Sequence, residues 1–464
     1  MAEVYVVGAG PAGSVFAARM AQLGHRVRLI EQTAFPRSRL GESLSPGVGP
    51  LLDSAELGAA IEPRNARRVR RVRVDWAEGP KWREDPREQG IIVDRGLFDL
   101  ALVERARAFG VDVGKPARLL RRSRAGGRWR LTVNSGGRNE ILEADFLADA
   151  TGRNRHSAGR RTGAPTLAAF AYWRAARLPE TPRIEAGDEA WFWSVPLPNG
   201  VFNTLAFVDP KTFRLMGGTL EERFGKLLGR STLVEDCRDA EIAGPVRAVD
   251  ATPYLSDELV AGDAIRLGDA AAALDPISSS GVQKAIQSAL SGAVVANTLI
   301  RKPERADAAM RFYRGQLNDA SERHRVWAAD HYAAVAERGG GMFWAERSRG
   351  REPSEGGPPM EPVDAREMAS MPVELSPEAS FVESPCLGGD FVAVAEALSH
   401  PGLASPVAYL AGFALAPLLR GLPAGMTPLE IAQTWRDRIP LESGLAIAGW
   451  LVNHGVLARS TNRK

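Results

Sequence analysis

The sequence is poor in cysteine and has no long hydrophobic run near its start. Its 464 residues include only two cysteines, Cys237 and Cys386, and no CxxC pair. This count argues against a disulfide framework and a cysteine-based zinc site, and it favours a reduced, cytoplasmic location. The first apolar run, Val4 to Val7, is too short for a signal-peptide core or a membrane span, so we expect no membrane-spanning segment.

Histidine is also scarce, and neither sign of charge dominates. The six histidines are scattered, and His324 and His331 lack the four-residue spacing of a helical ligand pair, so we predict no metal site. The formal net charge is only +3, and nucleic acid is not an expected partner. One segment differs, because six arginines without an acid stand at Arg64, Arg67, Arg68, Arg70, Arg71 and Arg73. Such a run is usually a solvated face; the alternative is a docking site for an anionic cofactor or an acidic protein surface.

The chain opens with the pattern of a βαβ unit. A buried strand is predicted at 4–7, a turn at 8–13, a helix at 14–23 and a second strand at 26–31. Short alternating strands separated by glycine pairs follow between 111 and 150, and aromatic strands follow from 167 to 208. These patterns indicate an α/β protein with an additional antiparallel sheet.

The first turn has the composition of a dinucleotide-binding loop. Gly8 makes the tight turn, Gly10 lets a phosphate approach the backbone, and Gly13 lets the helix pack on the strand, with Ala12 in the same loop. The helix amino terminus faces the expected pyrophosphate. Glu31, at the end of the second strand, is placed to accept ribose hydroxyls. The alternative is merely a tight strand-to-helix turn.

A second signal far down the chain identifies the dinucleotide as FAD. Gly268-Asp269 has the strand-end pattern in which an aspartate accepts hydrogen bonds from the ribityl chain. Pro276, Gly281 and Val282 then begin a helix whose amino terminus is expected to face the flavin pyrimidine. The alternative reading of Asp269 is an ordinary helix cap.

These residues resemble the flavoprotein monooxygenase superfamily with the para-hydroxybenzoate hydroxylase fold. Within it, Arg37 to Pro46, which contains Gly41-Glu42-Ser43, and Trp191 to Pro196 are similar to two segments of the flavin-dependent halogenase branch. The resemblance spans about Val4 to Ile300. It implies FAD as cofactor, dioxygen as co-substrate, and a reductant that is either NAD(P)H or a separate flavin reductase.

The resemblance also assigns roles to further residues. It implies cofactor contacts for Arg39 and Ser43, and for Arg95, which begins a helix near the flavin in relatives and otherwise forms a surface ion pair with Asp99. Three aromatic residues are candidates for a substrate pocket, and their alternative role is sheet core: Tyr172, Trp191 and Trp193. Strand alternation places Trp191 and Trp193 on one face.

Two departures from the halogenases favour hydroxylation. The position of their essential lysine, ahead of a tryptophan that resembles Trp76, falls on or near Arg68, and their catalytic glutamate is replaced by Ser278. A guanidinium stays protonated and cannot form a chloramine. The expected reaction is hydroxylation of an aromatic substrate by a flavin C4a-hydroperoxide. The catalytic residue is unknown, with Glu42 and Lys81 as candidates.

Among family members the combination is most similar to the peptidyl-tryptophan dihydroxylases of quinohemoprotein amine dehydrogenase maturation, which build cysteine tryptophylquinone. This implies a tryptophan side chain in a protein or peptide as substrate, and a complex with other maturation enzymes. The alternatives are a flavin-dependent halogenase of an indole or phenol, a saturating enzyme similar to geranylgeranyl reductase, and a non-catalytic flavoprotein maturation chaperone.

The predicted architecture is a Rossmann-like FAD-binding domain with an inserted antiparallel β-sheet substrate domain and a small, helical, winged-helix-like carboxyl-terminal module. We expect the FAD domain at 1–75, 111–160 and 256–346, a boundary segment at 76–110, the substrate domain at 161–255, a linker at 347–385 and the module at 386–464.

Overall fold

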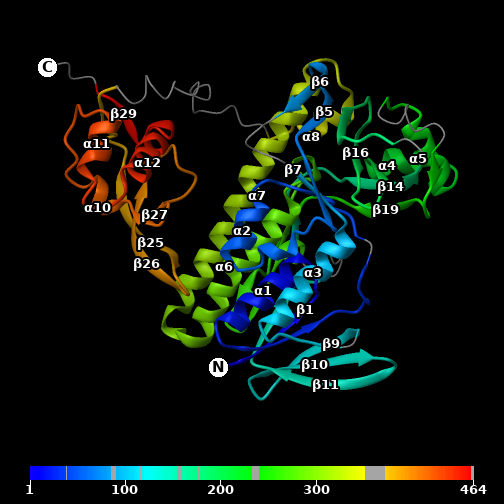
Figure 1. Cartoon of the computed structure of the whole chain (residues 1–464), viewed down its shortest axis with the longest axis horizontal. Helices are drawn as coiled ribbons and strands as arrows, with labels where there is room; N and C mark the ends of the chain where they lie inside the picture. Colours follow the sequence, from blue (N-terminus) through cyan, green and yellow to red (C-terminus); the bar gives the residue numbers. More distant parts are fainter. Residues whose placement is uncertain are drawn as a thin grey trace. The chain divides into compact units, whose positions relative to one another are not determined.

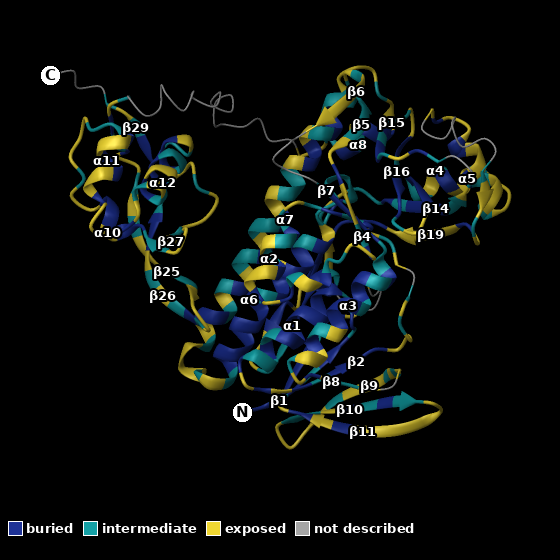
Figure 2. Ribbon diagram, in the orientation of Figure 1, coloured by how far each residue is buried: buried dark blue, intermediate teal, exposed yellow. Residues whose placement is uncertain are grey.

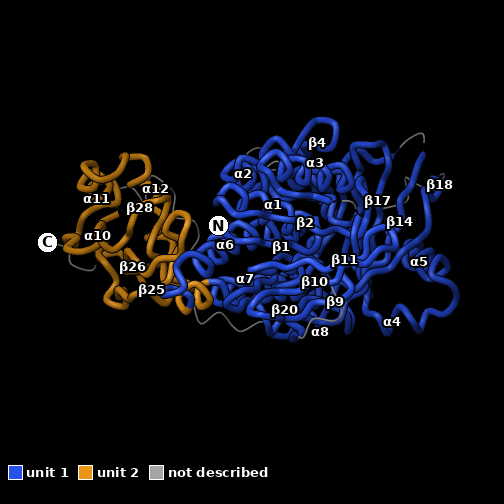
Figure 3. Tube along the Cα trace, turned by 90° about the horizontal axis from the view of Figure 1, so that it is seen from below, with its two compact units in different colours: residues 1–306, 313–351 blue, residues 307–312, 352–464 orange. Residues whose placement is uncertain are grey.

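The computed structural model describes residues 1–37, 39–84, 90–114, 116–153, 159–175, 178–232, 240–350 and 371–460. Chain contacts divide the protein into two compact units (Figure 3). The first comprises Met1–Ala306 and Tyr313–Arg351, and the second comprises Asp307–Phe312 and Glu352–Lys464. Within the described ranges, no helix combines the length and the apolar character needed to cross a membrane.

A mostly parallel sheet forms the centre of the first unit. Its strands lie in the order β21 (Val260–Ala261), β22 (Ala264–Arg266), β12 (Phe146–Asp149), β1 (Glu3–Val7), β2 (Arg26–Ile30) and β8 (Asp112–Val113). All neighbours pair in parallel except β21 with β22. Three helices cover one face (Figure 1): α1 (Pro11–Gln22), α3 (Arg95–Ala108) and α6 (Gly281–Arg301). This confirms the Rossmann-like domain assembled from distant segments.

A small antiparallel sheet covers the other face. It consists of β9 (Ala117–Ala125), β10 (Arg128–Ser135) and β11 (Arg138–Ala144). Leu131 and Val133 of β10 pack against Val7 and Ile30 of the parallel sheet. The domain therefore has three layers, and burial is greatest in α1, α6 and the parallel sheet (Figure 2).

The expected antiparallel substrate domain is an eight-stranded sheet. Its order is β18 (Glu241–Ile242), β14 (Leu167–Arg174), β17 (Phe202–Val208), β16 (Ala190–Pro196), β15 (Arg183–Ala186), β5 (Arg71–Trp76) and β6 (Gly79–Glu84), and β19 (Arg247–Asp250) also pairs with β14. The expected domain boundary after residue 75 was wrong. Strand β5 lies almost entirely within residues 1–75, which were assigned to the FAD domain, but it belongs to the substrate sheet, where it pairs in parallel with β15. A local pattern does not reveal such a distant partner.

Helices pack on both faces of this sheet. Side chains of α4 (Pro210–Leu215) and α5 (Leu220–Leu228) cover one face, where Phe192 lies. Side chains of α7 (Ala306–Ala336) and α8 (Met342–Arg347) cover the other, where Trp191 lies.

Short elements join the two large sheets. One small sheet contains β3 (Ser43–Leu44), β7 (Gly90–Val93) and β4 (Ala66–Val69), and another contains β13 (Gly159–Arg161), β20 (Tyr254–Ser256) and β23 (Ala272–Ala273). The remaining helices are α2 (Val48–Ser54) and the 3-10 turns η1 (Gly58–Ala60), η3 (Gly268–Ala270), η4 (Pro276–Ser278) and η5 (Pro303–Arg305).

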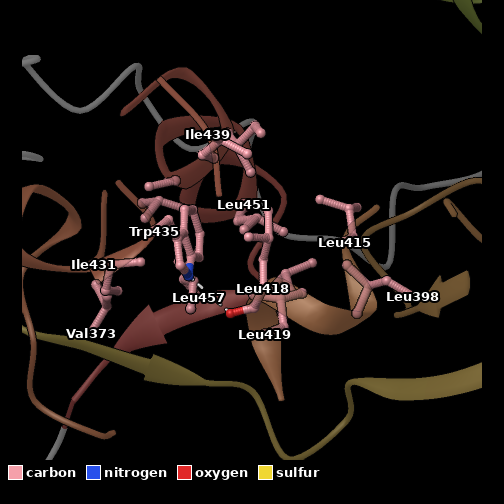
Figure 4. Close-up of a cluster of buried hydrophobic side chains, with 14 residues drawn as sticks. Val373, Leu398, Leu415, Leu418, Leu419, Ile431, Trp435, Ile439, Leu451 and Leu457 are labelled. Atoms are coloured by element: carbon pink, nitrogen blue, oxygen red, sulfur yellow. Dashed lines mark hydrogen bonds between the residues drawn. The ribbon is translucent and has the colours of Figure 1, made fainter. Parts of the chain in front are cut away.

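The second unit has its own hydrophobic core, which includes Trp435 and Leu451 (Figure 4). Its elements are β24 (Val373–Leu375) paired with β29 (Leu457–Arg459), the hairpin β25 (Ser380–Gly388) and β26 (Phe391–Ser399), the pair β27 (Tyr409–Leu410) and β28 (Phe413–Ala414), and the helices α10 (Ala416–Leu419), α11 (Pro428–Thr434) and α12 (Leu441–Asn453). It is thus a mixed α/β unit, whereas a helical module was expected.

The predicted linker was wrong at its carboxyl-terminal end. Strands β24 and β25 both begin before residue 386, within the segment expected to be a linker. Because β25 belongs to a two-stranded hairpin and is largely exposed or half-buried, it lacks the hydrophobic alternation of a strand that covers a core. Residues 351–370 of the same expected linker lie outside the described residues.

Candidate FAD-binding and active site

The Gly8 to Gly13 turn is built so that only glycine fits at its two ends. Gly8 has φ +101°, and a Cβ added there would lie 2.3 Å from the Ala150 carbonyl oxygen. A Cβ on Gly13 would lie 1.8 Å from the Gly8 carbonyl oxygen. Gly10 caps α1, and no side chain occupies the cap. The backbone amides at this helix start therefore fit a pyrophosphate.

Glu31 lies beside this turn, as the sequence predicts. Its Oε2 accepts hydrogen bonds from the Ala9 amide at 2.9 Å and from Arg37 Nη1 at 2.8 Å. Arg37 Nη2 also lies 3.8 Å from Asp99. Arg37 was not among the predicted cofactor residues, although it begins the halogenase-like segment. Contact of Glu31 with a ribose stays a prediction.

Asp269 contacts charged residues from two other parts of the chain. It forms ion pairs with Lys284 at 2.9 Å and with Arg153 at 3.3 Å. Burial alone would raise the pKa of Asp269, but the charges of Lys284 and Arg153 hold it below the ordinary value. Gly268 (φ +57°) packs so closely on Ala12 that a Cβ there would lie 2.8 Å from the Ala12 Cβ, so the two motifs meet. Lys284 escaped the sequence analysis, and its one signal is a charge on the buried face of α6.

The Leu40 to Gly47 segment lies against the start of α6. Ser45 Oγ donates a hydrogen bond to Gln283 Oε1 at 2.5 Å. A Cβ on Gly41, which has φ +98°, would lie 3.9 Å from Val282 Cγ2. Ser43 is on β3 beside this contact, and Pro276 and Gly281 begin η4 and α6 as predicted. The segment therefore adjoins the helix start expected to face the flavin.

Arg95 and Asp99 hold the same segment from α3. The guanidinium binds the Asp99 carboxylate through two hydrogen bonds of 3.0 and 3.1 Å, and Nη1 donates to the Leu40 carbonyl oxygen at 2.6 Å. The Arg95 and Asp99 side chains are 10% and 0% exposed. The alternative of a surface ion pair is therefore wrong, and Arg95 contact with FAD stays a prediction.

Glu42 is a buried carboxyl between the FAD domain and the substrate sheet. Its Oε1 accepts hydrogen bonds from the Tyr172 hydroxyl at 2.8 Å and from Asn203 Nδ2 at 3.1 Å, and its Oε2 accepts from the Gly41 amide at 2.9 Å. Burial raises the pKa of Glu42, although the hydrogen bond from Tyr172 opposes the rise. The sequence predicted Glu42 as a catalytic candidate and Tyr172 as a pocket residue, and the structure shows that they are hydrogen-bonded to each other. Asn203, which was not predicted, binds the same carboxyl group.

Lys81 is wrong as a catalytic candidate. It lies on β6 with 54% of its side chain exposed, in an ion pair with Glu78. An ammonium that is open to solvent and already neutralised does not serve as an active-site base. Arg39 and Arg68 are exposed as well.

The three predicted pocket aromatics divide into core and partly exposed residues. Trp191 is 2% exposed, stacks on Phe207 with ring centroids 3.8 Å apart and belongs to the core between sheet and helices. Its assignment to a pocket wall is therefore corrected to core. Trp193 shares the face of Trp191 as predicted, and both Trp193 and Tyr172 are only half-buried.

A large cavity lies at one end of the substrate sheet. Its volume is about 1650 Å³, and its wall includes Trp76, Phe343 and Trp344 with Lys211 and Arg338 at charged positions. None of the three predicted pocket aromatics lines it. Across the described ranges, no group of three or more His, Cys, Asp or Glu side chains is arranged to hold a metal ion.

Comparison with known families identifies the chain. A family model described as "Tryptophan halogenase" matches residues 84–370, and one described as "NAD(P)-binding Rossmann-like domain" matches residues 6–61. The chain belongs to the tryptophan halogenase family. This family of flavin-dependent halogenases and monooxygenases uses FAD, with reduced flavin from a reductase and with dioxygen. The protein is accordingly an FAD-dependent oxidoreductase.

Similar proteins within the family include halogenases and a hydroxylase. A tryptophan 2-halogenase of Chondromyces crocatus is 28% identical over 373 residues, which cover 75% of this chain and 71% of that protein. The structure titled "Peptidyl tryptophan dihydroxylase QhpG essential for tryptophylquinone cofactor biogenesis" is 28% identical, with a TM-score of 0.74 over 97% of this chain and 99% of that one. The halogenase CmlS shows the same fold, with a TM-score of 0.79 at 21% identity and coverage of 98% and 95%.

Proposed function

We propose that this family member is an FAD-dependent monooxygenase that hydroxylates a tryptophan side chain held in a protein or peptide. One observation carries the proposal: by resemblance, the position of the essential halogenase lysine falls on or near Arg68. It lies on β4, in the stretch from Ala66 to Trp76, which contains no lysine. A guanidinium cannot form the chloramine that an amine forms. Without that amine, we expect reduced flavin and dioxygen to transfer oxygen to the substrate and not to halogenate it.

Residues of this chain would bind the cofactor and would supply a buried group that can carry a proton. Reduced FAD, when bound, supplies the two electrons that activate dioxygen. The Gly8 to Gly13 turn would bind its pyrophosphate, and Asp269 would bind its ribityl chain. Glu42 would stand between cofactor and substrate as a buried carboxyl.

Similarity supports the choice of a peptide substrate. The dihydroxylase structure aligns with 97% of this chain, so the alignment extends into the second unit. We propose that the second unit, or the exposed arginines near Arg68, docks the substrate protein, and that the enzyme works in a complex with other maturation enzymes. The cytoplasmic location favoured by the low cysteine count belongs to the same proposal.

The test is a product analysis with the full chain, FAD, a flavin reductase and NADH. Tryptophan-containing peptides, intact candidate proteins and free tryptophan are compared in air, with and without bromide. We expect peptide or protein products heavier by oxygen atoms only, in amounts that do not depend on bromide. Conversion of free tryptophan alone would refute the peptide substrate, and a reaction that proceeds without oxygen would refute oxygenation.

Halogenation is the second candidate, because curated relatives such as the Chondromyces crocatus protein are named halogenases. A brominated product in the same experiment would establish it. The variant Arg68→Lys refines the comparison, since a restored amine at this position should permit bromide-dependent product only if Arg68 replaces the lysine. Oxygen uptake equal to that of free reduced flavin, with no product, would instead indicate a non-catalytic maturation chaperone.

A further inference from the structure

Glu42 is enclosed by groups that hold its two oxygens in different ways. The residue is 3% exposed, although it stands on a short connecting segment. Arg95 fixes this segment through the Leu40 and Gly41 carbonyl oxygens, and the Val93 amide donates to the Glu42 carbonyl oxygen at 2.8 Å. The carboxyl group therefore has a defined position and little access to water.

The two carboxyl oxygens differ in their capacity to carry a proton. Oε2 faces the Gly41 amide, which can only donate. Oε1 faces Asn203 Nδ2, another donor, and the Tyr172 hydroxyl, which can donate or accept. A proton on Oε1 can thus be donated to Tyr172 while both amide donors keep their hydrogen bonds. Tyr172 is half-buried, and rotation about its Cζ–Oη bond can direct the hydroxyl proton away from Glu42.

We propose that Oε1 of Glu42 stores a proton and passes it through the Tyr172 hydroxyl during turnover. The inference rests on the oxygenation proposed above. One oxygen atom of dioxygen enters the substrate and the other leaves as water, which requires two electrons and one proton from reduced flavin and one further proton. Tyr172 gives its hydroxyl proton to the departing oxygen and receives the proton of Glu42. Glu42 is left as a carboxylate, which regains a proton from solvent through the Tyr172 hydroxyl before the next turnover.

The electrostatic surroundings suit a proton donor. From α3, Arg95 is the cation that faces Glu42, and its charge is balanced by Asp99 and, more distantly, by Asp269. From the substrate sheet, the only titratable side chain that contacts the carboxyl group among the described residues is Tyr172. Burial raises the pKa of Glu42 beyond what Arg95 and the hydrogen bonds offset. The protonated form consequently persists to higher pH than in an exposed glutamate.

The test compares Glu42→Gln, Tyr172→Phe and the control Glu185→Gln in the FAD-loaded full chain. Glu185 is a suitable control because it is also buried in the substrate sheet, where it binds Ser231 and Thr232. In single turnovers with dioxygen and a tryptophan peptide, the first two variants should be slower by about 100-fold, with peptide Kd changed by less than about threefold. The control should keep the wild-type rate.

The pH profile and an infrared measurement separate a proton donor from a merely structural residue. Wild-type rates should fall as pH rises through the pKa of Glu42, and this limb should vanish in Glu42→Gln. Because the Tyr172 hydrogen bond lowers the pKa of Glu42, any residual alkaline limb in Tyr172→Phe should lie at higher pH. Asp275 is a second buried carboxyl with a raised pKa, so the measurement is the difference between the spectra of wild type and variant. A titrating carbonyl band should appear in the difference between wild type and Glu42→Gln, and be absent from the difference between wild type and Glu185→Gln.

Wild-type rates and an unchanged pH profile in Glu42→Gln would overturn the proposal, as would the absence of a carbonyl band from the difference between the spectra of wild type and this variant. Tyr172→Phe keeps the proposal testable if Glu42→Gln does not fold, since an unchanged rate and limb there would refute the relay. Halogenated products would refute oxygenation without affecting the infrared result. The two proposals can therefore fail separately.

Discussion

Arg37 and Glu31 form a nearly buried ion pair directly beside the Gly8 to Gly13 turn. Arg37 Nη1 lies 2.8 Å from Glu31 Oε2, and the two side chains are 9% and 8% exposed. The same glutamate oxygen accepts the Ala9 amide, so the ion pair is tied to the backbone of the turn. The halogenase-like segment is thereby anchored to the dinucleotide-binding motif.

Replacing Arg37 with alanine should therefore affect both stability and cofactor binding. The change leaves Glu31 buried without its cation, which costs about 3–5 kcal/mol for a buried pair. Urea unfolding and FAD titration measure the two effects. The control is Arg130→Ala, whose partner Glu143 and own side chain are about half exposed. For this control we expect the free energy of unfolding to fall by less than about 1 kcal/mol and the FAD affinity to stay unchanged. Equal losses of stability in both variants would contradict the expectation that the buried ion pair contributes more than the exposed one.

Gly13→Ala should abolish tight FAD binding. The new Cβ would collide with the Gly8 carbonyl oxygen, and backbone cannot give way as a flexible side chain can. The flavin absorbance per mole of purified protein measures the loss. Gly315→Ala is the matched control, because α7 leaves open space at that position. This variant should keep its flavin and gain about 0.5–1 kcal/mol, since alanine is the better helix former.

Because Asp275 is buried, we expect the free energy of unfolding of the protein to fall as pH rises. The residue is 8% exposed, and its carboxyl accepts a hydrogen bond from the Tyr332 hydroxyl at 2.8 Å. Burial raises the pKa of Asp275. A carboxyl with a raised folded pKa contributes stability below its unfolded pKa, and this contribution is lost as pH rises through the folded pKa.

The variant Asp275→Asn lacks this titration, so its stability relative to wild type should increase with pH. Urea unfolding over a pH series measures the difference. Asp112→Asn, at an exposed carboxyl on β8, should show a much smaller trend. A parallel pH dependence of wild type and Asp275→Asn would contradict the expectation.

Trp191→Ala should destabilise the first unit by about 3–5 kcal/mol, as expected when a fully buried aromatic residue is truncated. The indole stacks on Phe207 and meets Trp76 edge-on, so both contacts are lost. Thermal and urea unfolding measure the effect. Trp82→Ala is the control, because Trp82 is 53% exposed and contacts Arg71 at the surface. Its loss should stay near 1 kcal/mol or below.

Trp435→Ala should disrupt the second unit without removing FAD. Trp435 is 3% exposed, and its Nε1 donates to the Leu418 carbonyl oxygen at 2.9 Å within that unit's own core. Flavin content should stay at the wild-type level, while limited proteolysis should cleave the second unit. If this unit docks the protein substrate, peptide affinity should fall as well. Unchanged peptide affinity in a proteolytically sensitive variant would exclude that role.

Local signals determined the parts of the site that a short stretch of chain can build by itself. The Gly8 to Gly13 turn, the start of α6 at Gly281 and the glycine hairpin turns of the antiparallel sheet all follow from residues that are close in sequence. A turn needs positive φ or close backbone approach at one position, and glycine marks that position directly. For this reason the sequence alone predicted the FAD domain and its cofactor.

Tertiary structure decided which distant side chains meet. Glu42 contacts Tyr172 and Asn203 only because the substrate sheet closes over the Gly-Glu-Ser segment, and Lys284 reaches Asp269 only because α6 packs beneath η3. The same holds for the parallel pairing of β5 with β15 and for the burial of Trp191 under α7 and α8. Burial, ion pairing and the resulting pKa shifts depend on the packing of segments far apart in the chain, and no local pattern encodes that packing.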